Sequence, residues 1–115
     1  MLVTASDGLA WFKSDPEAGV LRLGGALGHN ASCDLIAAIV VSMTGEVKWR
    51  ELRLNEVKLF TIFGTRLVAG ACRLGEAHGT PLRLVYERDS IVHHLLLDAH
   101  LVPAGDLEGA CAPAS

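Results

Sequence analysis

Two short apolar runs separated by a polar turn open the chain and predict a β-hairpin. The runs Leu9 to Lys13 and Val20 to Leu23 have the length and composition typical of strands. Between them, Asp15 to Gly19 combines a proline, which fixes φ, with a glycine, which accepts positive φ. We therefore expect the two strands to pair across this turn. Met1 to Gly8 shows no strong pattern.

A helical spacing of apolar residues follows the hairpin. It predicts a helix from about Ala31 to Met43, with Asn30 as its N-terminal cap. The apolar residues that recur at this spacing, and that we expect to face the core, are Cys33, Ile36, Ala37, Val40 and Val41. Cys33 is then expected to be a core residue and not a reactive one.

The centre of the chain, Val57 to Leu74, has an apolar run that passes directly into a helical pattern. A strand at Trp49 to Leu54 precedes it, the apolar run ends in Phe63-Gly64, and a helix is expected from there to His78-Gly79. A tight turn from strand to helix places backbone N–H groups at a helix N-terminus, where anions are favoured. We expect function to depend on the residues of this turn.

A last strand and a last helix complete the pattern. Thr80 to Tyr86 is expected to be a strand, and Ile91 to about Leu101 a helix capped by Asp89 or Ser90. The order is β-β-α-β-α-β-α, which favours parallel pairing through right-handed crossovers. The predicted fold class is α/β, with a small mixed sheet of four to five strands.

The tripeptide Leu-Arg-Leu occurs in three of the predicted strands, centred on Arg22, Arg53 and Arg83. Strand side chains alternate between faces, so the leucines share one face and the arginines the other. We infer that the helices lie mainly on one face of the sheet. The arginines form either a basic stripe for an acidic partner or a solvated face neutralised by Glu51, Glu87 and Asp15.

Composition narrows the class of protein. The chain has 115 residues, half of them hydrophobic, and a net charge of −3, which fits one globular domain without a nucleic-acid-binding excess of basic residues. No apolar stretch approaches the ~20 residues of a membrane span, and no signal peptide is recognised. We expect a cytoplasmic protein without membrane insertion. Cys33, Cys72 and Cys111 are not clustered, so no metal site is expected. The sequence has no phosphate-binding loop, and no cofactor is expected either.

The stretch from Gly19 to Leu101 resembles the STAS domain, the fold of bacterial anti-sigma factor antagonists. The matching segments are the stretch Val20 to Leu27, read as a strand followed by G-x-L and a helix-capping segment, the strand at Leu52 to Val57, the signature loop at Phe60 to Leu67, the strand at Gly79 to Val85 and the closing helix at Ser90 to Leu101. The resemblance implies a small sheet with helices mainly on one face. It also implies a function in signal transduction and transcription regulation.

In this family, a serine or threonine directly before the glycine of the signature loop is phosphorylated by the anti-sigma kinase. Here Phe63 stands in that position, after Ile62 and Thr61. Phe63 has no hydroxyl to phosphorylate, so the usual switch is absent from its usual place. The loop Thr61, Ile62, Phe63, Gly64 and Thr65 is the predicted partner-binding site.

Three replacements for the switch stay open. The first is that Ile62 and Phe63 form an exposed apolar contact for a partner; the alternative is that both pack into the core. Thr61 or Thr65 accepts the phosphate or serves as an ordinary cap. Cys72 and Cys111 form a redox pair or stay reduced.

We therefore predict a STAS-like domain at residues 1–105 and a flexible tail at residues 106–115. The expected function is non-catalytic: the module binds an anti-sigma factor, a kinase-like ATPase, and so releases a sigma factor, and it exists as a monomer or weak dimer. The alternatives are a module of another signalling or transport assembly and a small-ligand or thiol-redox sensor. We recognise no grouping of a nucleophile, a base and an orienting residue in the sequence, so we do not expect an enzyme.

Overall fold

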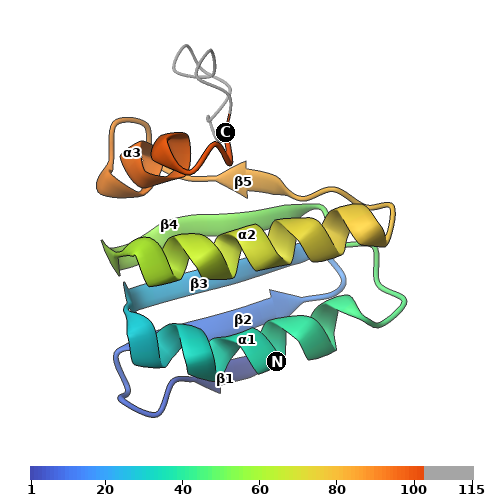
Figure 1. Ribbon diagram of the computed structural model, residues 1–115. Coiled ribbons are helices and arrows are strands. Elements are labelled where there is room, and N and C mark those ends of the chain that lie inside the picture. The colour runs from blue at the N-terminus through green and yellow to red at the C-terminus, as the bar shows by residue number, and fades with distance from the viewer. Residues whose placement is uncertain (103–115) are drawn as a thin grey trace.

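The structure, a computed structural model, describes residues 1–102 as a sheet of five strands with three helices (Figure 1). The element order is β-β-β-α-β-α-β-α, which is the predicted α/β class. The elements are β1 (Leu2–Thr4), β2 (Ala10–Asp15), β3 (Val20–Leu27), α1 (His29–Met43), β4 (Glu51–Phe60), α2 (Ile62–Ala77), β5 (Arg83–Val85) and α3 (Ile91–Asp98).

The sheet is mixed, and its strands lie side by side in sequence order. β1, β2 and β3 pair antiparallel, whereas β3, β4 and β5 pair parallel. The predicted hairpin is confirmed: β2 and β3 pair across a turn in which Gly19 has φ of 70°. Each parallel connection contains a helix, as a crossover requires.

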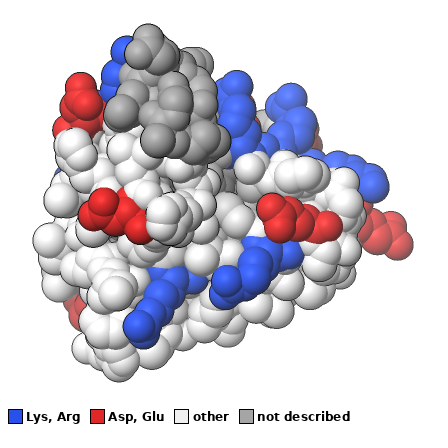
Figure 2. All heavy atoms as spheres, turned by 45° about the horizontal axis from the view of Figure 1, so that its top comes forward, with Lys and Arg blue, Asp and Glu red and all other residues white. Residues whose placement is uncertain are grey.

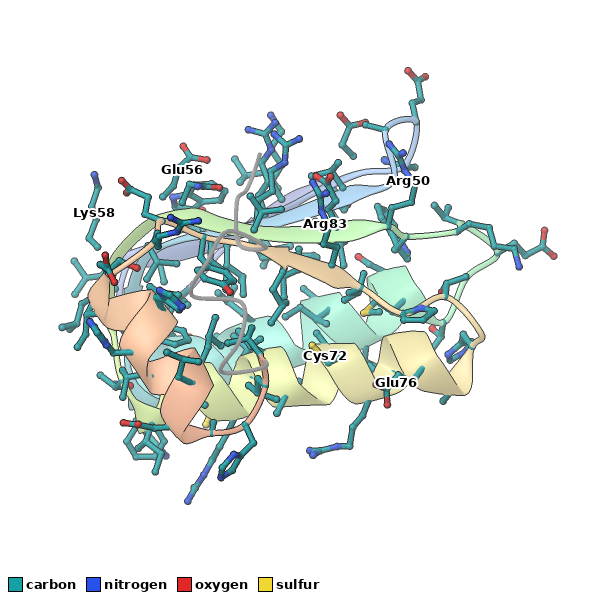
Figure 3. The ribbon with its side chains drawn as sticks, turned by 90° about the horizontal axis from the view of Figure 1, so that it is seen from above. Arg50, Glu56, Lys58, Cys72, Glu76 and Arg83 are labelled. Carbon is teal, nitrogen blue, oxygen red and sulfur yellow. The ribbon has the colours of Figure 1, made fainter. Side chains whose placement is uncertain are left out.

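All three helices lie on one face of the sheet, and the other face is free of helices (Figure 3). The Leu-Arg-Leu alternation explains this arrangement. Leu21, Leu23, Leu52 and Leu54 are almost fully buried under the helices. Arg83 is exposed on the opposite face, which we call the open face (Figure 3). Arg53, between the buried Leu52 and Leu54 on β4, points to the same face by alternation and is part-exposed.

The strands differ from the predicted ones at their ends. β1 was not expected, because its three residues carry no pattern. β3 continues through Gly24 and Gly25 to Leu27. The Trp11 ring lies where a Cβ of Gly24 would be, so this strand position requires a glycine. β5 has only three residues, fewer than the predicted Thr80 to Tyr86. β4 is one strand of ten residues that includes both Arg53 and Val57.

Helix α1 buries a different face from the predicted one. Its buried residues are Ala31, Leu35, Ile39 and Met43, spaced four apart. Val40 and Val41 are exposed, and so is Cys33. The prediction for these residues was wrong because apolar side chains lie all round this helix, so spacing alone does not select one face. The N-terminal cap is Gly28, not Asn30.

Helix α2 begins at Ile62, three residues before the predicted start after Gly64. Thr61 is its cap, with extended backbone at φ of −130° and a side chain that accepts a hydrogen bond from the Phe63 N–H. The strand before it ends at Phe60. Ile62 to Thr65 therefore form the first turn of α2 and are not an extended loop.

Helix α3 is shorter than predicted and ends at Asp98. Ser90 caps its start and accepts a hydrogen bond from the His93 N–H. At its end, the Leu101 N–H donates to Leu96 O and the His100 N–H to Leu97 O, the pattern of a Schellman motif. His100 takes the left-handed position of this motif with φ of 59°.

Within residues 1–102, none of the helices is both long enough and apolar enough to cross a membrane. The predicted tail at residues 106–115 lies outside the described residues.

Candidate functional site

The parallel strands β3, β4 and β5 all point toward the same edge of the sheet, where the chain passes into α1, α2 and α3 (Figure 1). We call this the carboxyl edge and define it by residues 27–29, 59–63 and 86–91. In open α/β sheets, ligands and partners bind preferentially at the carboxyl ends of the parallel strands. The predicted site, Thr61 to Thr65, lies at the middle of this edge.

Thr61 joins the two connections that lie side by side at this edge. Its hydroxyl donates to Leu27 O at 2.8 Å and accepts from the Phe63 N–H at 3.2 Å. Both hydrogen bonds hold the end of β3 against the start of α2. The Thr61 hydroxyl therefore caps α2 and links it to the end of β3. A phosphoryl group on this oxygen would replace its hydrogen atom and so remove the hydrogen bond to Leu27 O.

Thr65 is buried one helical turn further on. It is 7% exposed, and its hydroxyl donates to Thr61 O at 3.2 Å. A phosphate at this position would have to enter the interior of the domain. Of the two threonines predicted as alternative phosphorylation sites, neither presents a free hydroxyl at the surface.

Gly64 is fixed by close packing. A Cβ added here would lie 2.8 Å from two atoms of the Phe60 ring and 3.1 Å from the Leu27 Cβ. The helix can approach the ends of β3 and β4 only because this residue has no side chain. Steric packing against Phe60 and Leu27 therefore explains why a glycine occupies position 64, whether or not a partner binds here.

The sequence left open whether Ile62 and Phe63 are exposed to a partner or packed into the core, and the structure gives a different answer for each. Ile62 is 58% exposed, and at the same edge Leu59 and Ile91 are 53% and 57% exposed. Phe63 is half-buried. Ile62 therefore projects as an apolar knob at the carboxyl edge, whereas Phe63 packs along the helix layer.

Phe63 lines a shallow groove between α1 and α2. The His29 ring meets the Phe63 ring edge-on at 4.9 Å, and the Arg66 guanidinium carbon lies 5.9 Å from the centre of that ring. The groove has a volume of about 310 Å³, and its walls are His29, Ser32, Cys33, Ile36, Phe63, Arg66 and Leu67. Phe63 thus lies in a mainly apolar groove that also carries one cation, Arg66.

Cys33 lies in this groove, with its Sγ 3.9 Å from His29 Nε2. His29 Nδ1 lies 3.4 Å from Asn30 Oδ1. This grouping was missed because the sequence analysis assigned Cys33 to the core. The spacing of four residues between His29 and Cys33 on a helix is the signal that could have found it.

Cys72 is in a different environment. It is partly buried on α2 (Figure 3), and burial, with a smaller contribution from Glu76, raises its pKa to about 11. A thiol with so high a pKa is almost entirely protonated near neutral pH and is a poor nucleophile. Its predicted partner, Cys111, lies outside the described residues, so the redox pair stays a prediction.

The predicted arginine row lies on the open face, but acidic side chains meet it. Glu51 contacts Arg53 at 3.0 Å and Arg83 at 2.9 Å, and Arg22 lies 3.9 Å from Glu56. Glu51 was one of the anions expected to neutralise the row, whereas Glu56 was not considered. The arrangement favours the solvated, neutralised face over a free basic stripe.

Arg53 and Arg83 of the open face share Glu51 as an anion. Lys and Arg side chains gather along the upper margin of Figure 2, where the open face begins, and further basic and acidic side chains lie over the helix layer in the middle and lower part of the view. Burial alone would raise the pKa of Glu51, but the hydrogen bond from Arg53 and the charges of Arg53, Arg83 and Arg50 together lower it below its ordinary 4.5. The Glu51 carboxylate therefore stays charged, and its ion pair with Arg83 links β4 to β5.

In the part of the chain that the structure describes, no three His, Cys, Asp or Glu side chains converge on a point that could hold a metal ion. No protein-family model matches the chain, and no curated protein matches it. The molecule is defined so far by its fold, a five-stranded mixed sheet with three helices on one face, and by the apolar carboxyl edge.

Proposed function

We propose that this chain is a non-catalytic interaction module of the STAS type that binds an anti-sigma factor and thereby releases a sigma factor. The fold supports the proposal, because the resemblance implies a small sheet with helices mainly on one face. The place of Thr61 to Thr65 also supports it, since these residues form the start of α2 at the carboxyl edge.

The exposure of Ile62 is the observation that carries the proposal. A β-branched apolar side chain at the first position of a helix, 58% exposed and on the same edge as the exposed Leu59, contributes nothing to the core. A few side chains that a partner buries completely carry most of the binding energy at a protein interface, and we propose Ile62 as one of them. The proposed partner is a kinase-like ATPase of the bacterial cytoplasm.

The proposed module binds its partner without a phosphorylation switch at the usual position. Phe63 carries no hydroxyl, and the Thr61 and Thr65 hydroxyls are held in hydrogen bonds. Incubation of the folded chain with the cognate kinase is expected to leave its intact mass unchanged. One added phosphate on Thr61 or Thr65 would contradict this part of the proposal.

Replacement of Ile62 tests the interface. Ile62→Asp removes the apolar anchor and places a charge in the contact, so we expect the affinity for the purified anti-sigma factor to fall by about 30-fold or more, the effect of a hot spot worth about 2 kcal/mol. The measurement is isothermal titration calorimetry with the full chain.

Leu2→Asp is the matched control for this test. Leu2 is 63% exposed but lies on β1, which β2 and β3 separate from β4. The control should bind like the wild type, and circular dichroism should show both variants folded. Wild-type affinity for the Ile62 variant, or equal losses in both variants, would contradict the proposed interface.

The groove beside Phe63 favours one second function, a small-ligand sensor. A cavity of about 310 Å³ suits a small molecule, although it is shallow. A ligand that binds the folded state raises the melting temperature by linkage. If the chain is such a sensor, a thermal-shift screen with nucleotides and lipids should show a rise in melting temperature. No rise with any of these compounds would count against the sensor function.

A further inference from the structure

We propose that Cys33 is a nucleophilic thiol that forms a mixed disulfide with a small, carboxylate-bearing disulfide in the groove between α1 and α2. The inference rests on the proposed function in one respect, that the modified groove lies beside the docking residue Ile62. The chemistry itself depends only on residues of α1 and α2.

The first argument is the grouping of Cys33, His29 and Asn30. The Cys33 Sγ lies 3.9 Å from His29 Nε2, and His29 Nδ1 lies 3.4 Å from Asn30 Oδ1. In the tautomer in which Nδ1 donates to this amide oxygen, Nε2 is free to accept the proton of the thiol. A nucleophile, a base and a group that orients the base are thus in place.

The second argument is the groove itself. It leaves Cys33 exposed, so that a small molecule can reach the sulfur, and Phe63 holds the His29 ring edge-on at 4.9 Å. Ser32 lines the same groove, and its Oγ is buried without a hydrogen-bond partner among residues 1–102.

The third argument is charge. Arg66 lines the groove and is exposed, and no salt bridge within the described residues involves it. Its guanidinium can therefore bind a carboxylate of the ligand. The apolar walls provided by Ile36, Phe63 and Leu67 suit the carbon chain of the same molecule.

The step is a thiol–disulfide exchange. His29 Nε2 takes the Cys33 proton, and the thiolate attacks one sulfur of the incoming disulfide. A new S–S bond forms to Cys33 while the original S–S bond breaks, and the second sulfur leaves with the electron pair. The leaving thiolate takes the proton from His29, so the Cys33 sulfur is oxidised and the released thiol is the reduced product.

Glutathione disulfide is the probe for the experiment. The full chain with Cys72→Ser and Cys111→Ser retains only Cys33 and should gain one glutathionyl group by intact mass. With His29→Gln added, the rate near pH 7 should fall by about tenfold or more, because a positioned base typically contributes 10²–10⁴-fold. Near pH 10 the two rates should converge, because hydroxide in the solvent then replaces the positioned base.

Two results would overturn the proposal. One is a His29→Gln rate equal to that of the parent across this pH range. The other is a folded chain that reacts no faster than the same chain in urea. Thermal melts of each variant confirm that the folded state is being compared.

Arg66→Gln tests the recognition of the carboxylate. This change should slow the reaction with glutathione disulfide several-fold and leave the reaction with uncharged hydroxyethyl disulfide unchanged. Equal slowing with both probes would contradict the role of Arg66.

Partner binding separates this inference from the proposed function. The purified Cys33 adduct should bind the anti-sigma factor more weakly than the reduced chain. If the adduct forms but binding is unchanged, the regulatory role is contradicted while the docking site stands. If the Ile62→Asp variant binds normally while the adduct still forms, the docking site is wrong and the thiol chemistry stands.

Discussion

Gly64 is a single residue on which the geometry of the carboxyl edge depends. Its missing side chain lets α2 approach the Phe60 ring and Leu27 more closely than any other residue would allow. Gly70 lies on the same helix, but a Cβ added there would lie 3.7 Å from Ile36 Cδ1, which is ordinary contact. The two glycines therefore differ in environment and not in helix propensity.

We predict opposite effects for the two alanine substitutions. Gly64→Ala forces atoms together and should destabilise the fold by about 1–3 kcal/mol. Gly70→Ala should stabilise it by up to about 1 kcal/mol, because alanine has the higher helix propensity. Urea denaturation monitored by circular dichroism measures both. A neutral Gly64→Ala would show that the start of α2 can move away from the sheet.

At the scale of elements, helix α3 offers a test of its C-terminal motif. His100 has φ of 59°, a left-handed conformation that costs a residue with a Cβ about 1 kcal/mol more than glycine. We expect His100→Gly to stabilise the domain by about 0.5–1 kcal/mol, as measured by thermal and urea unfolding.

Ala99→Gly is the control for this prediction. Ala99, the adjacent residue, has φ of −88°, where alanine is not strained. The substitution should therefore destabilise the domain by a few tenths of a kcal/mol or more through the entropy of the unfolded chain. Stabilisation by both glycines, or by neither, would mean that the backbone conformation of His100 does not limit stability.

The helices also show what apolar spacing can and cannot determine. The start of α3 at Ile91 was predicted correctly, because Ser90 is a good cap directly before an apolar run. The start of α2 was placed three residues late, since Ile62 and Phe63 extend the apolar run of β4 and fit a strand as well as a helix. Thr61, a good capping residue, was the available signal.

The prediction of which face of α1 is buried was wrong for a related reason. Leu35 and Ile39 are buried while Val40 and Val41 are exposed, although all four are apolar. Which of them faces the core depends on where the helix lies on the sheet. That position is set by tertiary packing, which the sequence pattern does not encode.

At the scale of the whole molecule, the one-sided helix layer was predictable and the groove was not. Leucines and arginines alternate within single strands, so the sequence alone identified the two faces of the sheet. The groove joins His29 to Phe63, which are far apart in sequence and meet only because β3 and β4 end at the same edge. Sequence spacing can place residues on one element, but it does not bring two elements together.

Acid should weaken the whole fold through carboxylates that the folded state keeps charged. Hydrogen bonds from the Ser6 hydroxyl and N–H lower the pKa of Asp34 below 3.8. For Glu51, burial acts in the opposite direction, but its arginine contacts lower the pKa below 4.5. Folded-state pKa values below the unfolded ones mean that stability is fully present above about pH 4.5 and is lost as pH falls through the lowered values.

Glu51→Gln is the test of the acid limb. The variant should be less stable than the wild type near neutral pH, because Arg53 and Arg83 lose their charged partner. Its stability should change less between about pH 5 and pH 3 than that of the wild type. Urea midpoints measured across this range give the comparison, and parallel curves would show that Glu51 is not a source of the acid sensitivity.

Alkali should weaken the fold through Cys72, where the sign is reversed. Burial raises the pKa of this thiol from 9.0 to about 11, so the folded state holds its proton longer than the unfolded chain does. The stabilisation is complete below pH 9.0 and is lost as pH rises toward 11. Cys72→Ala removes the group, so its urea midpoint should fall less steeply over this interval than that of the wild type. An equally steep fall would mean that the thiol ionises in the folded chain as it does in the unfolded one, and Cys72 would then compete with Cys33 as the reactive thiol.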